Sequence, residues 1–219
     1  MNESKSNETF GDFSQYEKAR NDLFETSTLL FKFPREHEHE RYFLLAAVRR
    51  TLSLESAFRQ AVESRNGQMA MTLIRLNLDT LARLYALYWA EETKGMTAET
   101  LAMDVARGKS IKDMKLRGSK EKASDGWLIR QIEGLGKWIP KVYKKTSGAI
   151  HFSDFHISQL LQQAKPLKTL DDGSLHAELC LGPGEKDADP ELYRELKQAF
   201  LHISLMLIVA INHRCELVI

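Results

Sequence analysis

The chain has 219 residues, of which 43% are hydrophobic and 28% are charged, and its formal net charge is +1. This length and apolar content allow one large hydrophobic core. The balanced charge argues against a generally basic nucleic-acid binder and against an acidic solubilising tail. Two cysteines, Cys180 and Cys215, with no Cys-x-x-Cys pair, do not make a disulfide framework.

The first residues of the chain, 1–14, are polar and have no apolar centre of the kind that a signal peptide carries. The longest apolar run, Phe200 to Ile211, is shorter than the ~20 residues that cross a membrane. We therefore expect a cytoplasmic protein without membrane contact.

In chain order, we expect residues 1–12 to be disordered and residues 13–219 to form a single helical-bundle domain. Pro34 breaks the chain between the first two helices, and Gly67 is expected to cap the end of the second. The three helices predicted in this part of the chain cover 14–32, 35–64 and 68–94.

Shorter helices are expected in the middle of the chain, with Thr97 and Ser153 as N-cap residues and Pro140 opening the helix between them. The predicted helices from here on cover 97–108, 127–136, 140–151, 153–164 and 190–216. The Asp172-Gly173 turn, flanked by alternating apolar residues, predicts a small β-hairpin within 167–182. The sequence thus predicts an all-α, up-and-down helical bundle with a long antiparallel helix pair and one hairpin.

Charge is distributed unevenly along the chain. Residues 107–145 hold 12 basic and 4 acidic side chains, a net charge of +8, and we call them the basic segment. Residues 171–195 hold 2 basic and 8 acidic side chains, a net charge of −6, and we call them the acidic segment. Residues 1–40 carry a net charge of −4 from 5 basic and 9 acidic side chains. Either the basic segment offers a positive surface to an anionic partner, or these zones neutralise one another in the fold.

Arg75, Asp79 and Arg83 repeat at four-residue spacing in a helix that is apolar on most of its circumference. Such a helix is expected to be buried, and buried charges need partners because desolvating a lone ion costs several kcal/mol. Asp79 is therefore expected to pair with both arginines.

The helix that Pro140 opens divides into two faces at about 100° per residue. The lysines on one face are expected to meet water and comprise Lys141, Lys144 and Lys145. Tyr143, Ser147 and His151 share the other face and are expected to point inward, where Gly148 allows a neighbouring helix to approach.

Together, the two patterns predict a polar seam between the third helix and the helix of Pro140. The seam is either a hydrogen-bond network that fixes helix register, or a pocket in which an arginine binds phosphate and His151 acts as acid or base. His156 either lines the same seam or faces water.

The seam motifs carry a family resemblance. Arg75-x3-Asp79 in an apolar helix, followed by Tyr143-x3-Ser147-x3-His151, resembles a poorly characterised prokaryotic branch near the HEPN superfamily of helical bundles. Many HEPN proteins bind or cleave RNA, often in defence or toxin systems, and work as dimers. The resemblance therefore implies an all-α bundle with RNA and a second copy of the chain as partners.

The ribonuclease members of that superfamily carry an Arg, then four to six residues, then a His. This chain has no such pair, although Lys145-x5-His151 has the spacing. A lysine lacks the planar fork that grips a phosphate in two places.

Two functions stay open. In the first, the chain is an RNA-directed, metal-independent endoribonuclease whose lysine face guides the phosphodiester backbone. Arg75 or Arg83 would then hold the scissile phosphate, His151 would move a proton, and Tyr143 and Ser147 would orient the reacting groups. In the second, the chain is a non-catalytic module that dimerises through its long helices.

Metal and cofactor chemistry is not expected. Within 35–41, His37 and His39 diverge on a helix, and the pairs expected to meet are Glu36 with Glu40 and His37 with Arg41. No phosphate-binding loop or dinucleotide motif occurs in the sequence, so no nucleotide cofactor is expected.

Overall fold

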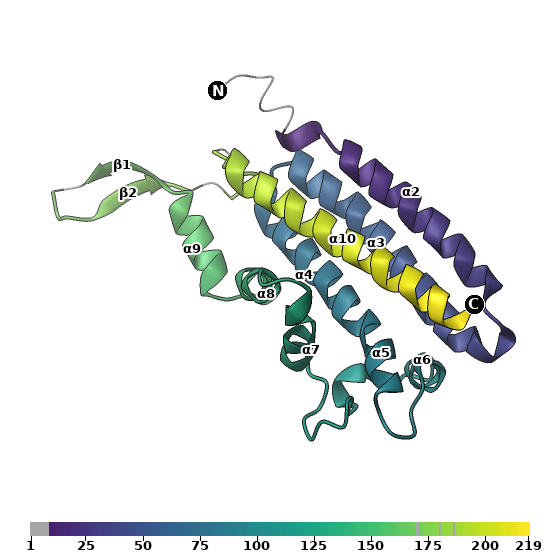
Figure 1. Ribbon diagram of the computed structural model, residues 1–219. Helices are drawn as coiled ribbons and strands as arrows, with labels where there is room; N and C mark the ends of the chain where they lie inside the picture. Colours follow the sequence, from purple (N-terminus) through teal and green to yellow (C-terminus); the bar gives the residue numbers. More distant parts are fainter. Residues whose placement is uncertain (1–8, 170, 180, 186) are drawn as a thin grey trace.

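A computed structural model describes residues 9–169, 171–179, 181–185 and 187–219 (Figure 1). The chain is an all-α helical bundle, as the sequence predicts. Its long helices are α2 (Ser14–Leu29), α3 (Glu38–Glu63), α4 (Gly67–Leu84) and α10 (Pro190–Val218). The 3₁₀ turns η1 (Leu30–Lys32) and η2 (Arg35–His37) carry the chain around Pro34 between α2 and α3.

The antiparallel pair of α3 and α4 turns at a different residue from the one expected. Asn66 is the N-cap of α4, where its side chain accepts a hydrogen bond from the backbone N–H of Met69, and Gly67 is the first helical residue. The left-handed position after α3 is taken by Arg65, with φ of 55°. A Cβ at Gly67 would lie 2.5 Å from Oε1 of Glu185, so a larger residue there would displace the end of that side chain.

The helix predicted over 68–94 is divided at Tyr85 into α4 and α5 (Ala86–Glu91). The elements that follow are α6 (Ala98–Ala106), η3 (Ile111–Asp113), α7 (Asp125–Ile132), η4 (Glu133–Leu135), α8 (Ile139–Ser147) and α9 (Asp154–Gln162). Thr97 and Ser153 cap α6 and α9 as expected, each in a reciprocal capping box.

These shorter elements bring the chain back to the start of the bundle, so α10 runs in the same direction as α4. Successive contacts with α10 record that direction: the Asn77 side chain of α4 donates to Oγ of Ser204 at 3.1 Å. Further along the chain, in α5, the Tyr88 hydroxyl donates to the carbonyl oxygen of Ala210 at 2.6 Å. Helix α4 consequently lies between α3 and α10 and contacts α7 and α8 as well (Figure 1).

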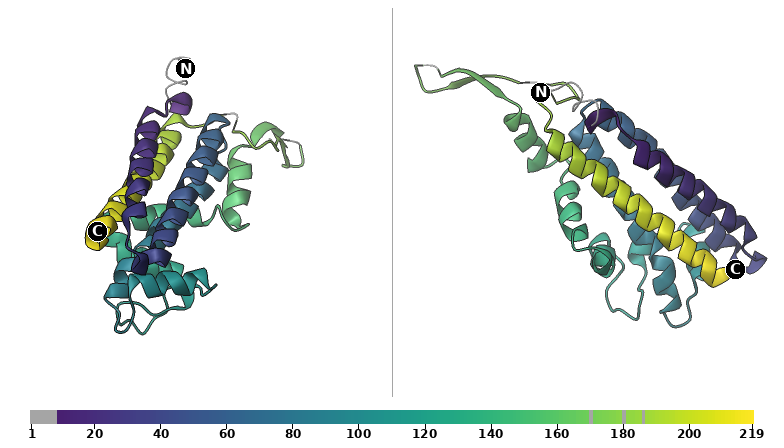
Figure 2. Two further views of the ribbon diagram at one scale, coloured as in Figure 1. Left: turned by 90° about the vertical axis from the view of Figure 1, so that its right-hand side faces the viewer. Right: turned by 45° about the horizontal axis from the view of Figure 1, so that its top comes forward.

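An arm, made of α9 with strands β1 (Lys165–Thr169) and β2 (Leu175–Glu178), projects from the bundle (Figures 1 and 2). The strands are antiparallel, with Lys165 opposite Glu178, and together span 165–178, whereas the sequence predicts a hairpin within 167–182. Helix α9 has no buried residue. The arm is therefore held to the bundle by little apolar packing.

The amino-terminal boundary of the fold lies earlier than expected. Residues 9–11 form a helical turn, and Phe10 is buried against Tyr193 with ring centroids 5.0 Å apart. Residues 9–12 therefore belong to the fold and are not disordered. The remainder of the expected disordered stretch, residues 1–8, lies outside the described residues.

Aromatic side chains from three helices fill one end of the core. Phe58 of α3 and Phe200 of α10 stack with centroids 4.5 Å apart, and Tyr16 of α2 lies over both at about 6 Å. Helix α10 is long and apolar enough to cross a membrane by length and composition, yet half of its most apolar window is buried inside the fold. Its apolar character is thus used in the core.

Replacing the stacked Phe58 should destabilise the bundle strongly. Phe58→Ala removes a fully buried ring and leaves a cavity, so we expect a loss of about 3–5 kcal/mol in the free energy of unfolding, measured by urea denaturation. Phe31→Ala, at a ring that is 70% exposed, is the control and should change stability by less than about 0.5 kcal/mol. Equal losses in the two variants would contradict this packing.

Candidate functional site

The arginine ladder of α4 exists and extends to α7. Asp79 pairs with Arg83 and lies 3.5 Å from Nη1 of Arg75, as the spacing predicts. A second carboxylate, Asp125 at the start of α7, lies 2.8 Å from Nη2 of Arg83 and 3.7 Å from Nη2 of Arg75. The two guanidinium groups therefore face two carboxylates, and the four charges balance.

Arg75 is the buried member of the ladder. The residue is 6% exposed, and its guanidinium carbon lies 4.3 Å from the ring centroid of Tyr143 on α8. A cation over an aromatic face is favourable, especially out of water. Tyr143 thus reaches the seam as expected, and it covers Arg75 with its ring.

His151 does not enter the seam. The prediction that Tyr143, Ser147 and His151 all point inward is therefore wrong for His151. Helix α8 ends at Ser147 because Gly148 begins a turn, so the 100° periodicity does not carry through to residue 151. His151 is exposed and forms no hydrogen bond, ion pair or ring contact with the described residues. An acid or base function of His151 beside Arg75 therefore has no geometric basis.

Ser147 also turns away from the α4 arginines. Its hydroxyl donates to the carbonyl oxygen of Tyr143 in its own helix at 2.6 Å. A different group joins α4 to the turn after α8: the Thr72 hydroxyl donates to the carbonyl oxygen of Ala149 at 3.1 Å. Gly148 itself faces α9 and not α4, because a Cβ there would lie 3.0 Å from Cβ of Phe155.

The lysines of α8 face water as expected. Lys141 and Lys144 are exposed and form no ion pair among the described residues, and Lys145 lies 3.6 Å from Glu195 of α10. His156 lies outside the seam. Its Nδ1 accepts from the backbone N–H of Ser153 at 3.3 Å, so it completes the α9 cap.

The outer end of the ladder opens on a groove of about 400 Å³ between α3 and α4. Asp79 and Arg83 line it together with Phe43, Ala47 and Arg50 of α3. Arg50 donates from Nε to the Thr80 hydroxyl at 3.0 Å and forms no ion pair with the described residues. An anionic group above an apolar surface is the chemistry that this groove can accommodate.

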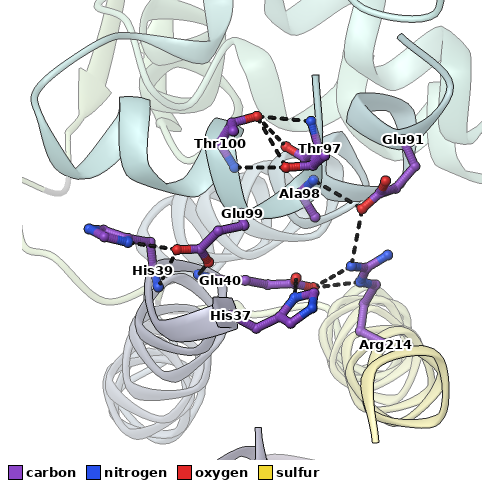
Figure 3. Close-up of polar contacts among 9 residues, drawn as sticks. All are labelled: His37, His39, Glu40, Glu91, Thr97, Ala98, Glu99, Thr100 and Arg214. Atoms are coloured by element: carbon purple, nitrogen blue, oxygen red, sulfur yellow. Dashed lines mark hydrogen bonds and ion pairs between the residues drawn. The ribbon is translucent and has the colours of Figure 1, made fainter. Parts of the chain in front are cut away.

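A second charged cluster, which the sequence did not reveal, joins the start of α3 to the end of α10 (Figure 3). Glu40 is fully buried and accepts from Nε of Arg214 at 2.6 Å, with Nη2 of the same arginine at 2.5 Å. His37 lies against the other oxygen of Glu40 at 3.0 Å, and Glu91 lies 3.6 Å from Arg214. The cluster is a closed ion-pair network, as a buried pair requires.

The pairs expected within 35–41 are replaced by others. His37 contacts Glu40 and Arg41 contacts Glu38, each three residues away, a spacing that also meets on a helix surface. His39 diverges from His37 as expected and contacts Glu99 at 2.7 Å (Figure 3). No metal-binding group of His, Cys, Asp or Glu residues occurs in the part of the chain that the structure describes.

Glu99 fixes α6 against the first turn of α3. Its carboxylate accepts from the backbone N–H groups of His39 at 3.1 Å and Glu40 at 2.8 Å, where a helix N-terminus favours an anion. Burial raises the pKa of Glu99, but these hydrogen bonds and His39 lower it more, so the pKa lies below its ordinary value.

Burial raises the pKa of the Cys215 thiol to about 11, which keeps that thiol protonated.

The chain matches no known family model, and comparisons with curated proteins and with solved structures find no match. The HEPN-like assignment therefore stays a prediction.

Removing the shared carboxylate of the ladder should lower stability. Asp79→Ala leaves Arg75 buried with one fewer counter-charge, so we expect a loss of about 1–3 kcal/mol and a lower melting temperature. Asp113→Ala, which breaks an exposed pair with Lys122, is the control and should stay within about 0.5 kcal/mol of wild type. A wild-type melting temperature for Asp79→Ala would mean that Arg75 does not depend on this carboxylate.

Ionised Glu99 should make the free energy of unfolding fall as the pH is lowered. Because its pKa is lowered in the folded state, the stabilisation is present above the ordinary value of 4.5 and is lost as the pH falls through the lower, folded value. Glu99→Gln should be less stable at neutral pH and should lose less stability on acidification, followed by urea denaturation between about pH 6 and pH 3. Glu25→Gln, at an exposed position of α2, is the control that should keep the wild-type pH profile.

Proposed function

We propose that this chain is a HEPN-like, RNA-directed protein that binds RNA through the basic segment. The observation that carries the proposal is a set of exposed cations in this segment that form no ion pair with the described residues. They are Arg107, Lys112, Lys115, Lys120, Lys137, Lys141 and Lys144. Cations without counter-charges attract the phosphodiester backbone, and binding releases the counterions that surround it.

The same charge distribution argues against the seam as a ribonuclease site. Arg75 and Arg83 are already engaged by Asp79 and Asp125, so a phosphate would have to compete with two carboxylates. His151 lies outside the seam and has no side-chain partner that would set its tautomer. We therefore propose that the protein binds RNA without cleaving it at the seam. The seam fixes the packing of α4 against α7 and α8.

A second candidate function, a non-catalytic interaction module, is favoured by the apolar side chains that α9 leaves uncovered. Ile157 is 54% exposed, Leu161 is 63% exposed, and Phe152 just before the helix is 87% exposed. Contiguous exposed apolar surface on a small domain marks an interaction site more often than a free surface. RNA binding and protein association use different side chains here, so the two functions are compatible.

Neutralising the α8 lysines should weaken RNA binding with little dependence on sequence. For Lys141→Ala with Lys144→Ala, we expect lower affinity for single-stranded RNA and a slope of log K against log salt that is shallower by about 0.7 per lost phosphate contact. Fluorescence anisotropy at several salt concentrations measures both. Lys18→Ala with Lys32→Ala, two exposed lysines near α2, removes the same charge elsewhere and should keep the wild-type slope.

Cleavage is assayed in the same samples, with EDTA present. Wild type and His151→Ala should bind RNA equally and leave it intact. Absence of RNA binding by the wild type would refute the proposed function. Cleavage that His151→Ala abolishes would restore the catalytic alternative.

A further inference from the structure

The two oppositely charged segments of this chain do not neutralise each other within one molecule. Lys145 and Glu195 form an ion pair that joins them. The other ion pairs of the basic segment's cations go to acids outside the acidic segment: Asp104, Glu92, Asp113 and Glu121. The cations that form no ion pair are exposed, and so is Asp171 of the acidic segment, which has no ion pair among the described residues.

The arm places these charges beside an apolar helix face. Ile157 and Leu161 are four residues apart and share one face of α9, and both are more than half exposed. Because α9 has no buried residue, this face does not contribute to the core of its own bundle. Strands β1 and β2 continue the arm away from the bundle (Figures 1 and 2), and Asp171 lies in the chain between them.

The geometry of the chain brings the basic surface close to the base of the arm. Lys141 and Lys144 lie on α8, and a short turn leads from α8 into α9. A two-fold dimer in which the arm of each molecule meets the basic segment of the other would pair the two oppositely charged segments. Each contact would then occur twice, as an isologous interface requires.

We propose that the arm is the docking surface for a second copy of this chain. In this dimer the α9 face buries Ile157 and Leu161 against the partner, and acidic side chains of the segment 171–195 meet exposed lysines of the partner's basic segment. The apolar contact supplies affinity, and the charge complementarity sets orientation and partner choice. Because each molecule contributes one arm, the two-fold dimer buries the contact area of an arm twice. A stable interface buries roughly 1,200–2,000 Å² in total.

This dimer regulates the site of the proposed function. The lysines that would hold RNA are those that the partner's arm covers, so RNA and dimerisation compete for them. RNA should shift the protein toward monomer, and a dimer should bind RNA less tightly. The dimer itself does not depend on RNA binding, whereas the competition does.

A charge-swap experiment tests the dimer directly, by sedimentation velocity on nuclease-treated full-length protein at low and high salt. One variant reverses two exposed acids, Asp171→Lys with Asp187→Lys, and the other reverses two exposed lysines, Lys141→Glu with Lys144→Glu. Each variant alone should dimerise at least about tenfold more weakly than wild type, with salt reducing the difference. An equimolar mixture should recover the lost association, because both reciprocal contacts of the heterodimer pair opposite charges: one as in wild type, the other with both signs reversed.

The apolar contact has its own variant and a matched control. Ile157→Ser with Leu161→Ser should give a monomer with wild-type circular dichroism. Leu205→Ser with Val209→Ser changes two exposed residues at the same spacing on α10 and should leave the dimer intact. Wild type that is monomeric at all concentrations would overturn the proposal. So would dissociation caused by the α10 variant and not by the α9 variant, because the interface would then lie on the long helices.

The RNA competition is measured separately, by adding single-stranded RNA to the wild-type dimer. Dissociation on RNA binding supports the competition, and RNA that binds while the dimer persists overturns it. If RNA does not bind at all while the charge swap restores the dimer, the proposed function fails and the docking surface stands. The two failures are therefore distinguishable.

Discussion

Burial of α4 is the constraint on which the rest of the fold depends. This helix is covered by α3, α10, α7 and α8, so each buried polar side chain on it needs a partner from a neighbouring helix. Asn77 is fully buried and bonds to Ser204 of α10 and Thr51 of α3, while Thr80 accepts from Arg50 of α3. Arg75 meets Asp125 of α7 and the ring of Tyr143 on α8. Each of these pairs forms when the neighbouring helix is at one position along α4. The polar groups of α4 therefore specify how its neighbours pack.

The Glu40–Arg214 pair plays the same part at the other end of the bundle. It joins residues that are 174 positions apart, so it forms when α10 has closed against the start of α3. Replacing such a pair by apolar residues is often neutral for stability, whereas removing one partner is costly. Its contribution is therefore to define the closed arrangement of first and last helices, with Glu91 adding a third charge. The buried ion pair thus specifies where the helices lie more than it adds to stability.

Sequence reasoning reached the parts of the structure that local spacing determines. The all-α class, the burial of α4 and the Arg75–Asp79–Arg83 ladder follow from apolar periodicity and i,i+4 geometry, and the structure bears them out. His151 was misplaced because a helical wheel assumes a continuous helix, and α8 ends four residues before it. Asp125 and Arg214 were missed because their partners lie 42 and 174 residues away, where no local pattern links them. A buried Glu40 in a run of charged residues gave no signal, since its neighbours in sequence face water.

The contrast between interior and exterior charge is what favours association over catalysis. Inside, the guanidinium groups of Arg75, Arg83 and Arg214 face carboxylates, and such saturated sites have little capacity to stabilise a developing charge. Outside, Lys141 and Lys144 of α8 form no ion pair with the described residues, and neither does Asp171 on the arm. Unbalanced surface charge acts over a distance and sets which partner approaches and in what orientation. The seam therefore holds the scaffold together, and it positions α8 and the arm, the two surfaces at which we propose that RNA and a second copy bind.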